Sequence, residues 1–330
     1  MCRNQSVLPD DTAIKVAVRL KRERFLSLKP GITSESRINS AGGYLMDQQT
    51  MVYRIISLEG LMSILINKEE RFVRPIDSWE DTFEGYMLHM LDSQDGMKTI
   101  LSRLYIMSGR NQWITIRNLS KLLRSRYACY GQCWSKNPDS DAMWRIYSYD
   151  KKAIQLVSKI GSIQSMIDDA AWEGLETEIA EVKYDINDET EALNKILIPT
   201  AKIDMAYFHK RPAFKHESEV RVLLNDLKKY ESIDVFASTA IGSNLKYADP
   251  RKTEPEQIQE AVSHLVNDKG GYLSIAPKEV KMEIKDMKSY LNGIRVHPQA
   301  PDWYVALIRK ICRNYKISFM GKSDLYRPAI

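Results

Sequence analysis

Cysteine is scarce in this chain, and the cysteines present do not form a zinc-binding pattern. The four cysteines are Cys2, Cys129, Cys133 and Cys312. Cys129 and Cys133 lie close together but have no second pair at a matching spacing, which argues against a structural zinc site. We interpret all four as reduced thiols and expect a cytoplasmic protein.

Long apolar runs are also missing. The sequence contains no stretch of about 18 consecutive apolar residues, the length that a membrane-spanning helix needs. We therefore predict no membrane span. No apolar segment follows the first residues, and we expect no signal peptide.

The signature motifs of several enzyme classes are absent too. The chain has no Gly-x-Gly-x-x-Gly, no Gly-x-x-x-x-Gly-Lys, no Gly-x-Ser-x-Gly and no His-Glu-x-x-His. These absences argue against a Rossmann dinucleotide site, a P-loop, an α/β-hydrolase nucleophile and a zinc protease helix.

What is present is a globular composition with a mild positive charge. Apolar residues make up 44% of the 330 residues, charged residues 28%, and the formal net charge is +5. Such a charge permits an anionic partner, such as nucleic acid, but does not require one.

The sequence divides into two predicted regions. Residues 1–50 should form a basic helix followed by a flexible, turn-rich linker. Residues 51–330 should form a single domain with a helical insertion near 228–270. Strands and helices alternate irregularly in this domain, which favours the α+β class over a doubly wound α/β fold.

Alternating apolar patterns and capping residues predict the individual elements. Strands are expected over residues 51–56, 70–75, 128–135, 153–157, 178–185, 218–224, 272–276, 280–284, 294–298 and 317–320. Helices are expected over residues 57–66, 86–127, 141–148, 158–174, 188–197, 256–266 and 303–311, with Ser57, Asp141 and Asp302 as N-caps. Residues 76–85, the acidic loop, should be irregular.

Residues 206–224 carry the densest group of charged and aromatic side chains. Glu217 and Glu219 are two apart, so on an extended chain their carboxylates would point the same way. Two neighbouring carboxylates raise the pKa of one of them unless cations compensate. Such a pair suits acid–base or cation-stabilising chemistry, and a salt-bridged strand edge is the alternative interpretation. The nearby cations are Lys210, Arg211, Lys215 and Arg221.

Polar residues occur at three of the predicted strands, in chain order: Arg54, then Ser135 after Trp134, then the Glu217/Glu219 pair. An arginine can hold a phosphate bidentately, and a serine beside an aromatic ring can fix a ribose or an amide. A glutamate can stabilise an oxocarbenium-like cation as a glycosidic bond breaks. Together these groups suit NAD. The alternative is a structural ion pair for the arginine and a turn for the serine.

Separate pieces of the sequence also resemble a known family. They are Tyr53-Arg54, the Trp79–Gly85 run, Cys133-Trp134-Ser135, Met143-Trp144, Lys210 with His216–Arg221, Val296–Pro301 and Lys322–Tyr326. Their combination resembles a bacterial family catalogued as domain of unknown function two-nine-seven-one, over roughly residues 51–326. Glu80 stands where that family usually has Asn, and Thr82 where it has Pro.

The order of arginine, serine and Glu-x-Glu in this family is similar to that of ADP-ribosyltransferases, which implies a split, mainly antiparallel sheet with flanking helices. The resemblance implies that Arg54 holds the NAD phosphates and that Ser135 contacts the nicotinamide ribose. It also implies that Glu219 stabilises the ribosyl cation and that Glu217 orients the acceptor.

We assign the neighbouring side chains to the same site. Tyr53 and Trp134 are expected to line the NAD site, and Lys215, His216 and Arg221 to contact the substrate or acceptor. NAD is then a substrate, and we expect no metal.

The working hypothesis is an NAD-dependent mono-ADP-ribosyltransferase that modifies nucleic acid or protein. The basic stretch Arg117–Arg126 and the basic N-terminal helix favour an RNA or DNA acceptor. Members of the resembled family often look like accessory proteins of mobile elements and anti-phage systems, which implies a defence toxin with an antitoxin or accessory partner.

Two alternatives stay open. One is a non-enzymatic protein of a mobile-element or defence system that binds nucleic acid or a protein partner. The other is a metal-dependent nuclease that uses His209 and His216 with Glu217, Glu219 and Lys215.

Overall fold

The computed structural model describes residues 46–81, 83–196, 203–226, 239, 241–266 and 277–327. The predicted basic helix at the N-terminus, its linker as far as residue 45 and the strand predicted over 272–276 lie outside these residues. The described residues form an α+β fold with a mixed, mostly antiparallel sheet and flanking helices, as the irregular alternation of elements predicted.

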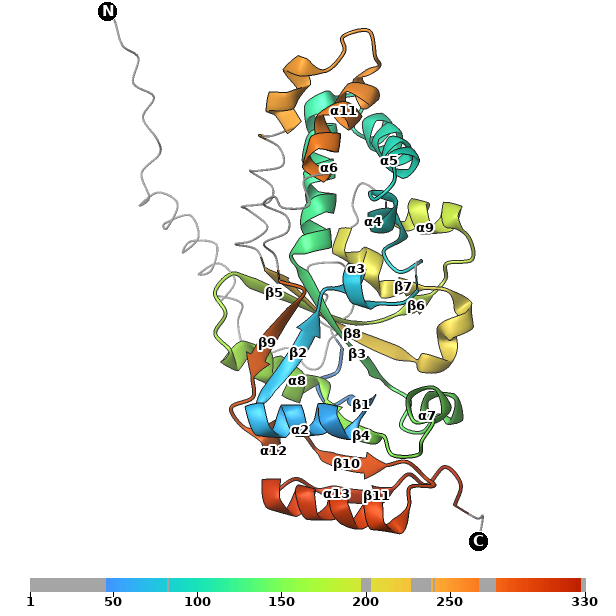
Figure 1. Cartoon of the computed structure of the whole chain (residues 1–330), viewed down its shortest axis with the longest axis vertical. Helices are drawn as coiled ribbons and strands as arrows, with labels where there is room; N and C mark the ends of the chain where they lie inside the picture. Colours follow the sequence, from blue (N-terminus) through green and yellow to red (C-terminus); the bar gives the residue numbers. More distant parts are fainter. Residues whose placement is uncertain are drawn as a thin grey trace, which may run out of the picture. The chain divides into compact units, whose positions relative to one another are not determined.

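Nine strands of the described residues form the main sheet (Figure 1). They are β1 (Met51–Ile56), β2 (Glu69–Val73), β3 (Cys129–Ser135), β4 (Ile154–Lys159), β5 (Leu175–Glu181), β8 (Glu219–Asp226), β9 (Glu279–Glu283), β10 (Gly293–Val296) and β11 (Phe319–Lys322). The order is β11-β10-β4-β1-β3-β2-β9, and β8 joins β3 to β5. Within this sheet the β10–β11 pair is parallel and the other pairs are antiparallel.

Strand β3 pairs with three other strands of this sheet, β1, β2 and β8. One of its edges pairs with β8 along the whole strand, from Cys129↔Asn225 to Ser135↔Glu219. Its other edge is shared, because β1 joins it at Tyr53↔Ser135 and β2 joins it at Val73↔Gly131. The strands β1 and β2 therefore meet β3 at different points and separate from each other along it.

Apolar cores cover the two faces of the sheet, because side chains alternate along each strand. Leu223 of β8 belongs to one core, and its neighbours Val222 and Leu224 belong to the other. The first core is built with α4 (Tyr86–Met90), α5 (Gln94–Met107), α6 (Gln112–Tyr127), α9 (Glu189–Ile196) and α11 (Glu254–Val266). The second is built with α2 (Leu58–Asn67), α8 (Ile160–Asp169), α12 (Met287–Tyr290) and α13 (Asp302–Tyr315).

Local sequence signals explain most element boundaries. Ser57 caps α2 as predicted, since its hydroxyl accepts a hydrogen bond from the Gly60 N–H. The predicted cap Asp141 is wrong by one residue, because Ser140 caps α7 (Asp141–Tyr147) by accepting from the Met143 N–H. Asp302 likewise lies in the first turn of α13, and Pro301 is the N-cap.

Two further predictions need correction. The stretch predicted as one helix over 86–127 is three helices, because Ser93 caps α5 and positive-φ residues follow its end. The acidic loop begins with a short helix, α3 (Pro75–Ser78), since proline is well suited to a first helical position. In the described part of the chain, no helix is both long and apolar enough to span a membrane.

Candidate functional site

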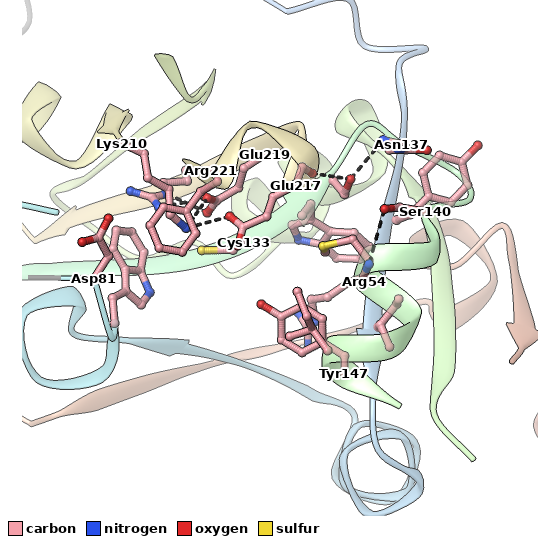
Figure 2. Close-up of a pocket in the computed structure, with 18 of the residues that line it drawn as sticks. Arg54, Asp81, Cys133, Asn137, Ser140, Tyr147, Lys210, Glu217, Glu219 and Arg221 are labelled. Atoms are coloured by element: carbon pink, nitrogen blue, oxygen red, sulfur yellow. Dashed lines mark hydrogen bonds and ion pairs between the residues drawn. The ribbon is translucent and has the colours of Figure 1, made fainter. Parts of the chain in front are cut away.

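A cavity of about 910 Å³ opens where β1, β3 and the start of β8 come together (Figure 2). The acidic loop and α7 provide further walls, together with the 3₁₀-helix η2 (Pro212–Glu217). The lining residues are Tyr53, Arg54, Ile55, Ser78, Trp79, Glu80, Asp81, Glu84, Cys133, Trp134, Ser135, Asn137, Ser140, Met143, Ile146, Tyr147, Gln155, Lys210, Arg211, Phe214, Glu217, Glu219 and Arg221.

The strand register places two of the three predicted polar positions, Ser135 and Glu219, side by side, and the third, Arg54, is next to the residue that pairs with Ser135. Ser135 of β3 is paired with Tyr53 of β1 on one edge and with Glu219 of β8 on the other. Arg54 follows Tyr53 and points to the opposite face of its strand. It nevertheless lines the same cavity, as its neighbours Tyr53 and Ile55 do.

Most of the predicted site residues lie at this cavity. Tyr53, Arg54, Trp134, Ser135, Glu217, Glu219 and Arg221 all line it. Lys215 and His216 do not line it; they are exposed on η2.

Arg54 already has an acidic partner. Both of its terminal nitrogens lie 3.1 Å from Glu70 Oε2, and its guanidinium lies 5.2 Å from the centre of the Trp134 ring. Burial lowers the pKa of Arg54, but the Glu70 carboxylate outweighs burial and raises it, so the group stays charged. Its side chain is 18% exposed and lines the cavity.

Glu70 is itself fixed by buried donors. Its Oε1 accepts from the Tyr290 hydroxyl at 2.8 Å, and its Oε2 accepts from Gln132 Nε2 at 2.8 Å. The orientation of Arg54 is therefore set by a network that sequence inspection did not reveal, since Glu70 and Tyr290 are far apart in the chain.

Trp134 and Ser135 have internal partners as well. Trp134 is only 2% exposed, and its indole N–H donates to Gln132 Oε1 at 2.7 Å. The Ser135 hydroxyl donates to the Glu217 carbonyl oxygen at 2.6 Å and accepts from the Asn137 N–H at 3.0 Å. Ser135 thus ties the end of β3 to the segment that carries the two glutamates.

The two glutamates are not on one extended chain, contrary to the prediction. Glu217 ends η2, Ser218 adopts a left-handed conformation with φ 43°, and Glu219 begins β8. Both carboxylates nevertheless bind the same cation. Lys210 Nζ lies 2.6 Å from Glu217 Oε2 and 3.5 Å from Glu219 Oε2.

Arg221 is a buried partner of Glu219. Its Nε lies 2.6 Å from Glu219 Oε1, and one terminal nitrogen lies 2.7 Å from Glu84 Oε2. The Trp79 ring covers the guanidinium at 4.0 Å. Arg221 was predicted to contact the substrate or acceptor, but its side chain is 1% exposed and its nitrogens bind these groups instead.

The carboxylates of this cluster differ in proton affinity. Burial raises the pKa of Glu219, but the charges of Arg221 and Lys210 outweigh burial and hold it below the ordinary glutamate value. For Glu84, burial prevails over the same two cations, and the pKa is raised. Burial also raises the pKa of the Cys133 thiol beside Glu219. At neutral pH Glu219 is therefore an anion next to an uncharged thiol.

Several functional candidates were not predicted from sequence alone. Glu84 and Trp79 come from the acidic loop, and Gln155 comes from β4. The only sequence signal for them was the Trp79–Gly85 run that resembled the family. Lys210 was noted as a cation near the glutamates and as part of the family resemblance, but it was not assigned to the site.

The arrangement proposed for a nuclease is not assembled. His209 pairs with Asp185 at 2.7 Å, while His216 is exposed on η2. Within the described ranges, no three His, Cys, Asp or Glu side chains are placed as a metal-ion site would need.

No protein-family model matches the chain, and no curated protein or solved structure matches it significantly. The family resemblance therefore stays a prediction based on the quoted residues.

Proposed function

We propose that this protein is an NAD-dependent mono-ADP-ribosyltransferase and that the cavity binds NAD as its substrate. The observation that carries the proposal is the register row Tyr53–Ser135–Glu219 across three adjacent strands, with Arg54 beside it. The residues that the ADP-ribosyltransferase resemblance requires thus surround one cavity, although they are separated by long stretches of sequence.

The size of the cavity supports a nucleotide ligand. Its volume of about 910 Å³ lies within the range of small-molecule and cofactor sites, roughly 300–1,000 Å³. Aromatic and apolar side chains, among them Tyr53, Met143, Tyr147 and Phe214, provide surfaces for flat rings.

An unpaired amide oxygen also supports an amide-bearing ligand. Gln155 lines the cavity, and its Nε2 donates to the Pro138 carbonyl oxygen at 2.8 Å. Its Oε1 is buried and has no hydrogen-bond partner. Leaving such an acceptor unsatisfied costs about 1–3 kcal/mol. An N–H donor brought to this oxygen, such as the nicotinamide carboxamide, would satisfy it.

The ionised Glu219 suits the central step. As the bond between nicotinamide and ribose breaks, its electron pair leaves with the ring nitrogen, and positive charge develops on the ribose. A fixed carboxylate stabilises that charge. The acceptor then bonds to the ribose carbon and releases its proton to water, and in this proposal Glu217 orients the acceptor. Arg54 lines the same cavity, and its charged guanidinium suits the pyrophosphate.

The acceptor is proposed to be a nucleic acid or a protein. The basic stretch Arg117–Arg126 lies on α6 and does not line the cavity, and Arg126 pairs with Asp92 at 2.5 Å. The basic stretch on α6 is therefore not part of the cavity wall, and an RNA or DNA acceptor that contacts it would do so outside the cavity. Its binding should weaken as salt concentration rises.

The decisive experiment incubates the full chain with NAD labelled on its adenylate and offers protein, RNA and DNA acceptors separately. We expect wild type to transfer label to one of them and Glu219→Gln to be slower by on the order of a hundredfold. Glu181→Gln is the matched control, because Glu181 is an exposed glutamate that pairs with Lys136 outside the cavity.

Absence of both NAD cleavage and transfer in wild type would overturn the proposal. Binding of nucleic acid or protein without NAD chemistry, unchanged in Glu219→Gln, would instead favour the non-enzymatic alternative. A defence-toxin role predicts in addition that expression arrests growth, that Glu219→Gln relieves the arrest, and that an antitoxin or accessory protein suppresses it in the cytoplasm.

A further inference from the structure

Lys210 is the point where the acidic side chains of the cavity converge. Its Nζ lies 2.6 Å from Glu217 Oε2, 2.9 Å from Glu84 Oε1 and 3.5 Å from Glu219 Oε2. These carboxylates come from η2, from the acidic loop and from β8. Figure 2 shows the Lys210 side chain among the groups of this end of the cavity.

The backbone does not place Glu217 beside Glu219. The left-handed residue Ser218 separates a 3₁₀-helix from a strand, so the alternation of an extended chain does not operate between them. Arg221 donates to Glu219 through Nε at 2.6 Å and through a terminal nitrogen at 2.9 Å. Its other hydrogen bonds among the described residues go to Glu84 and to the Tyr207 carbonyl oxygen, and not to Glu217. Lys210 is the cation that Glu217 and Glu219 share.

We propose that Lys210 is a positioning residue that holds the Glu217 and Glu219 carboxylates together in the working arrangement, with Glu84 holding Lys210 in place. This inference rests on the proposed transferase function, because the working arrangement is defined by that reaction. Lys210 acts through the two glutamates and is not assigned a contact with the reacting atoms.

The net charge around Lys210 predicts how the pKa of Glu219 should change when Lys210 is replaced. Glu84, Glu217 and Glu219 face Lys210 and Arg221, so full ionisation leaves one net negative charge in the cluster. Removing the Lys210 charge leaves two. Close opposite charges shift a carboxyl pKa by about 1–3 units, so losing this one should raise the pKa of Glu219 by about one unit or more.

The other titratable groups facing the cluster are Cys133 on β3, Tyr147 on α7 and Tyr184 on β6 (Lys183–Tyr184). Burial raises the pKa of the Cys133 thiol and raises the pKa of Tyr184 to about 12. Burial also raises the pKa of Tyr147 to about 12. These groups are uncharged through the acidic and neutral range and do not account for a shift there.

The test compares Lys210→Met and Lys210→Arg with wild type by the pH dependence of NAD cleavage. We expect Lys210→Met to move the acidic limb of the profile to higher pH by about one unit, and Lys210→Arg to keep it closer to wild type. Lys136→Met is the matched control, since it removes a lysine–glutamate pair outside the cavity. An unshifted acidic limb in Lys210→Met would overturn the inference.

A second readout does not need activity. Titration of the glutamate side-chain carboxyls by carbon NMR in the full chain should show the Glu219 resonance, assigned with Glu219→Gln, titrating at higher pH in Lys210→Met than in wild type. The same Glu219 titration in both proteins would contradict the role of Lys210 even if NAD chemistry were observed. A shifted Glu219 titration without NAD chemistry would support the positioning role of Lys210 and reject the proposed transferase function.

Discussion

At the scale of single residues, we expect the charge of one buried side chain, Glu219, to affect both stability and activity. Glu219 is 5% exposed and is hydrogen bonded to Arg221 and close to Lys210. Breaking a buried ion pair by removing one partner leaves an uncompensated charge, which is costly. The same contacts that the proposed chemistry uses thus also hold the η2–β8 segment in place.

The first prediction concerns stability in acid. Because the folded-state pKa of Glu219 lies below its ordinary value of 4.5, its ionised form stabilises the fold above that value. This contribution is lost as the pH falls from 4.5 through the folded pKa. The midpoint of urea unfolding should therefore fall more steeply over that range in wild type than in Glu219→Gln.

Glu84 changes the pH dependence of stability in the opposite direction to Glu219, so a variant of each glutamate tells the two apart. Its pKa is raised, so the proton it binds favours the folded state below 4.5, and this contribution fades as the pH rises through the folded pKa. In Glu84→Gln the acid-induced loss should be at least as steep as in wild type. Equal slopes in Glu219→Gln and wild type would contradict the assignment of a lowered pKa to Glu219.

At the scale of elements, β3 connects the sheet to the site through close packing. Gly131 lies at the pairing point with β2, and the Trp79 ring packs directly over it. Trp79 in turn covers Arg221, the partner of Glu219. The glycine therefore permits the approach of the acidic loop to the sheet.

Gly131→Ala should lower stability. A Cβ at this position would stand 2.7 Å from Trp79 Cζ2 and 3.1 Å from Leu223 Cδ2, so the indole would have to move. Such overpacking costs about 1–3 kcal/mol, which urea unfolding would measure.

Gly60→Ala is the matched control for this prediction. A Cβ there meets its nearest atoms at 3.6 Å, and alanine favours the helical conformation of α2. The control should be neutral or more stable. Equal effects of the two substitutions would show that Trp79 is not held against β3 in this way.

At the scale of the whole domain, the C-terminal segment supports a cavity wall formed far earlier in the chain. The Ser323 hydroxyl donates to Asp139, and the Tyr326 hydroxyl donates to Asp141 at the start of α7. Asp139 also accepts from the Trp144 indole at 3.0 Å. The wall-forming residues Met143, Ile146 and Tyr147 belong to this helix.

Ending the chain after Lys322 should therefore loosen α7 and weaken NAD binding without unfolding the sheet. The two lost hydrogen bonds, worth roughly 1 kcal/mol each, set an upper limit of about thirtyfold on the loss in NAD affinity, and we expect a loss of about tenfold. Calorimetric titration with NAD would measure it. A chain ending after Arg327 keeps both contacts and is the control; an equal loss in both truncations would contradict this role of the segment.

The sequence by itself determined the class of fold and most element positions. Alternating apolar residues identified β1 and β3, and Ser57 identified the start of α2, because side-chain periodicity and capping depend only on neighbouring residues. It also identified Arg54, Ser135 and the two glutamates as candidate site residues.

Only the tertiary structure decided how those residues meet. The pairing of Ser135 with both Tyr53 and Glu219 depends on strand order and register, which local patterns do not encode. The partners Glu70 of Arg54 and Glu84 of Lys210 come from other segments. A buried charge must find a counter-charge wherever the fold brings one within reach, and that choice becomes visible only when the whole chain is packed.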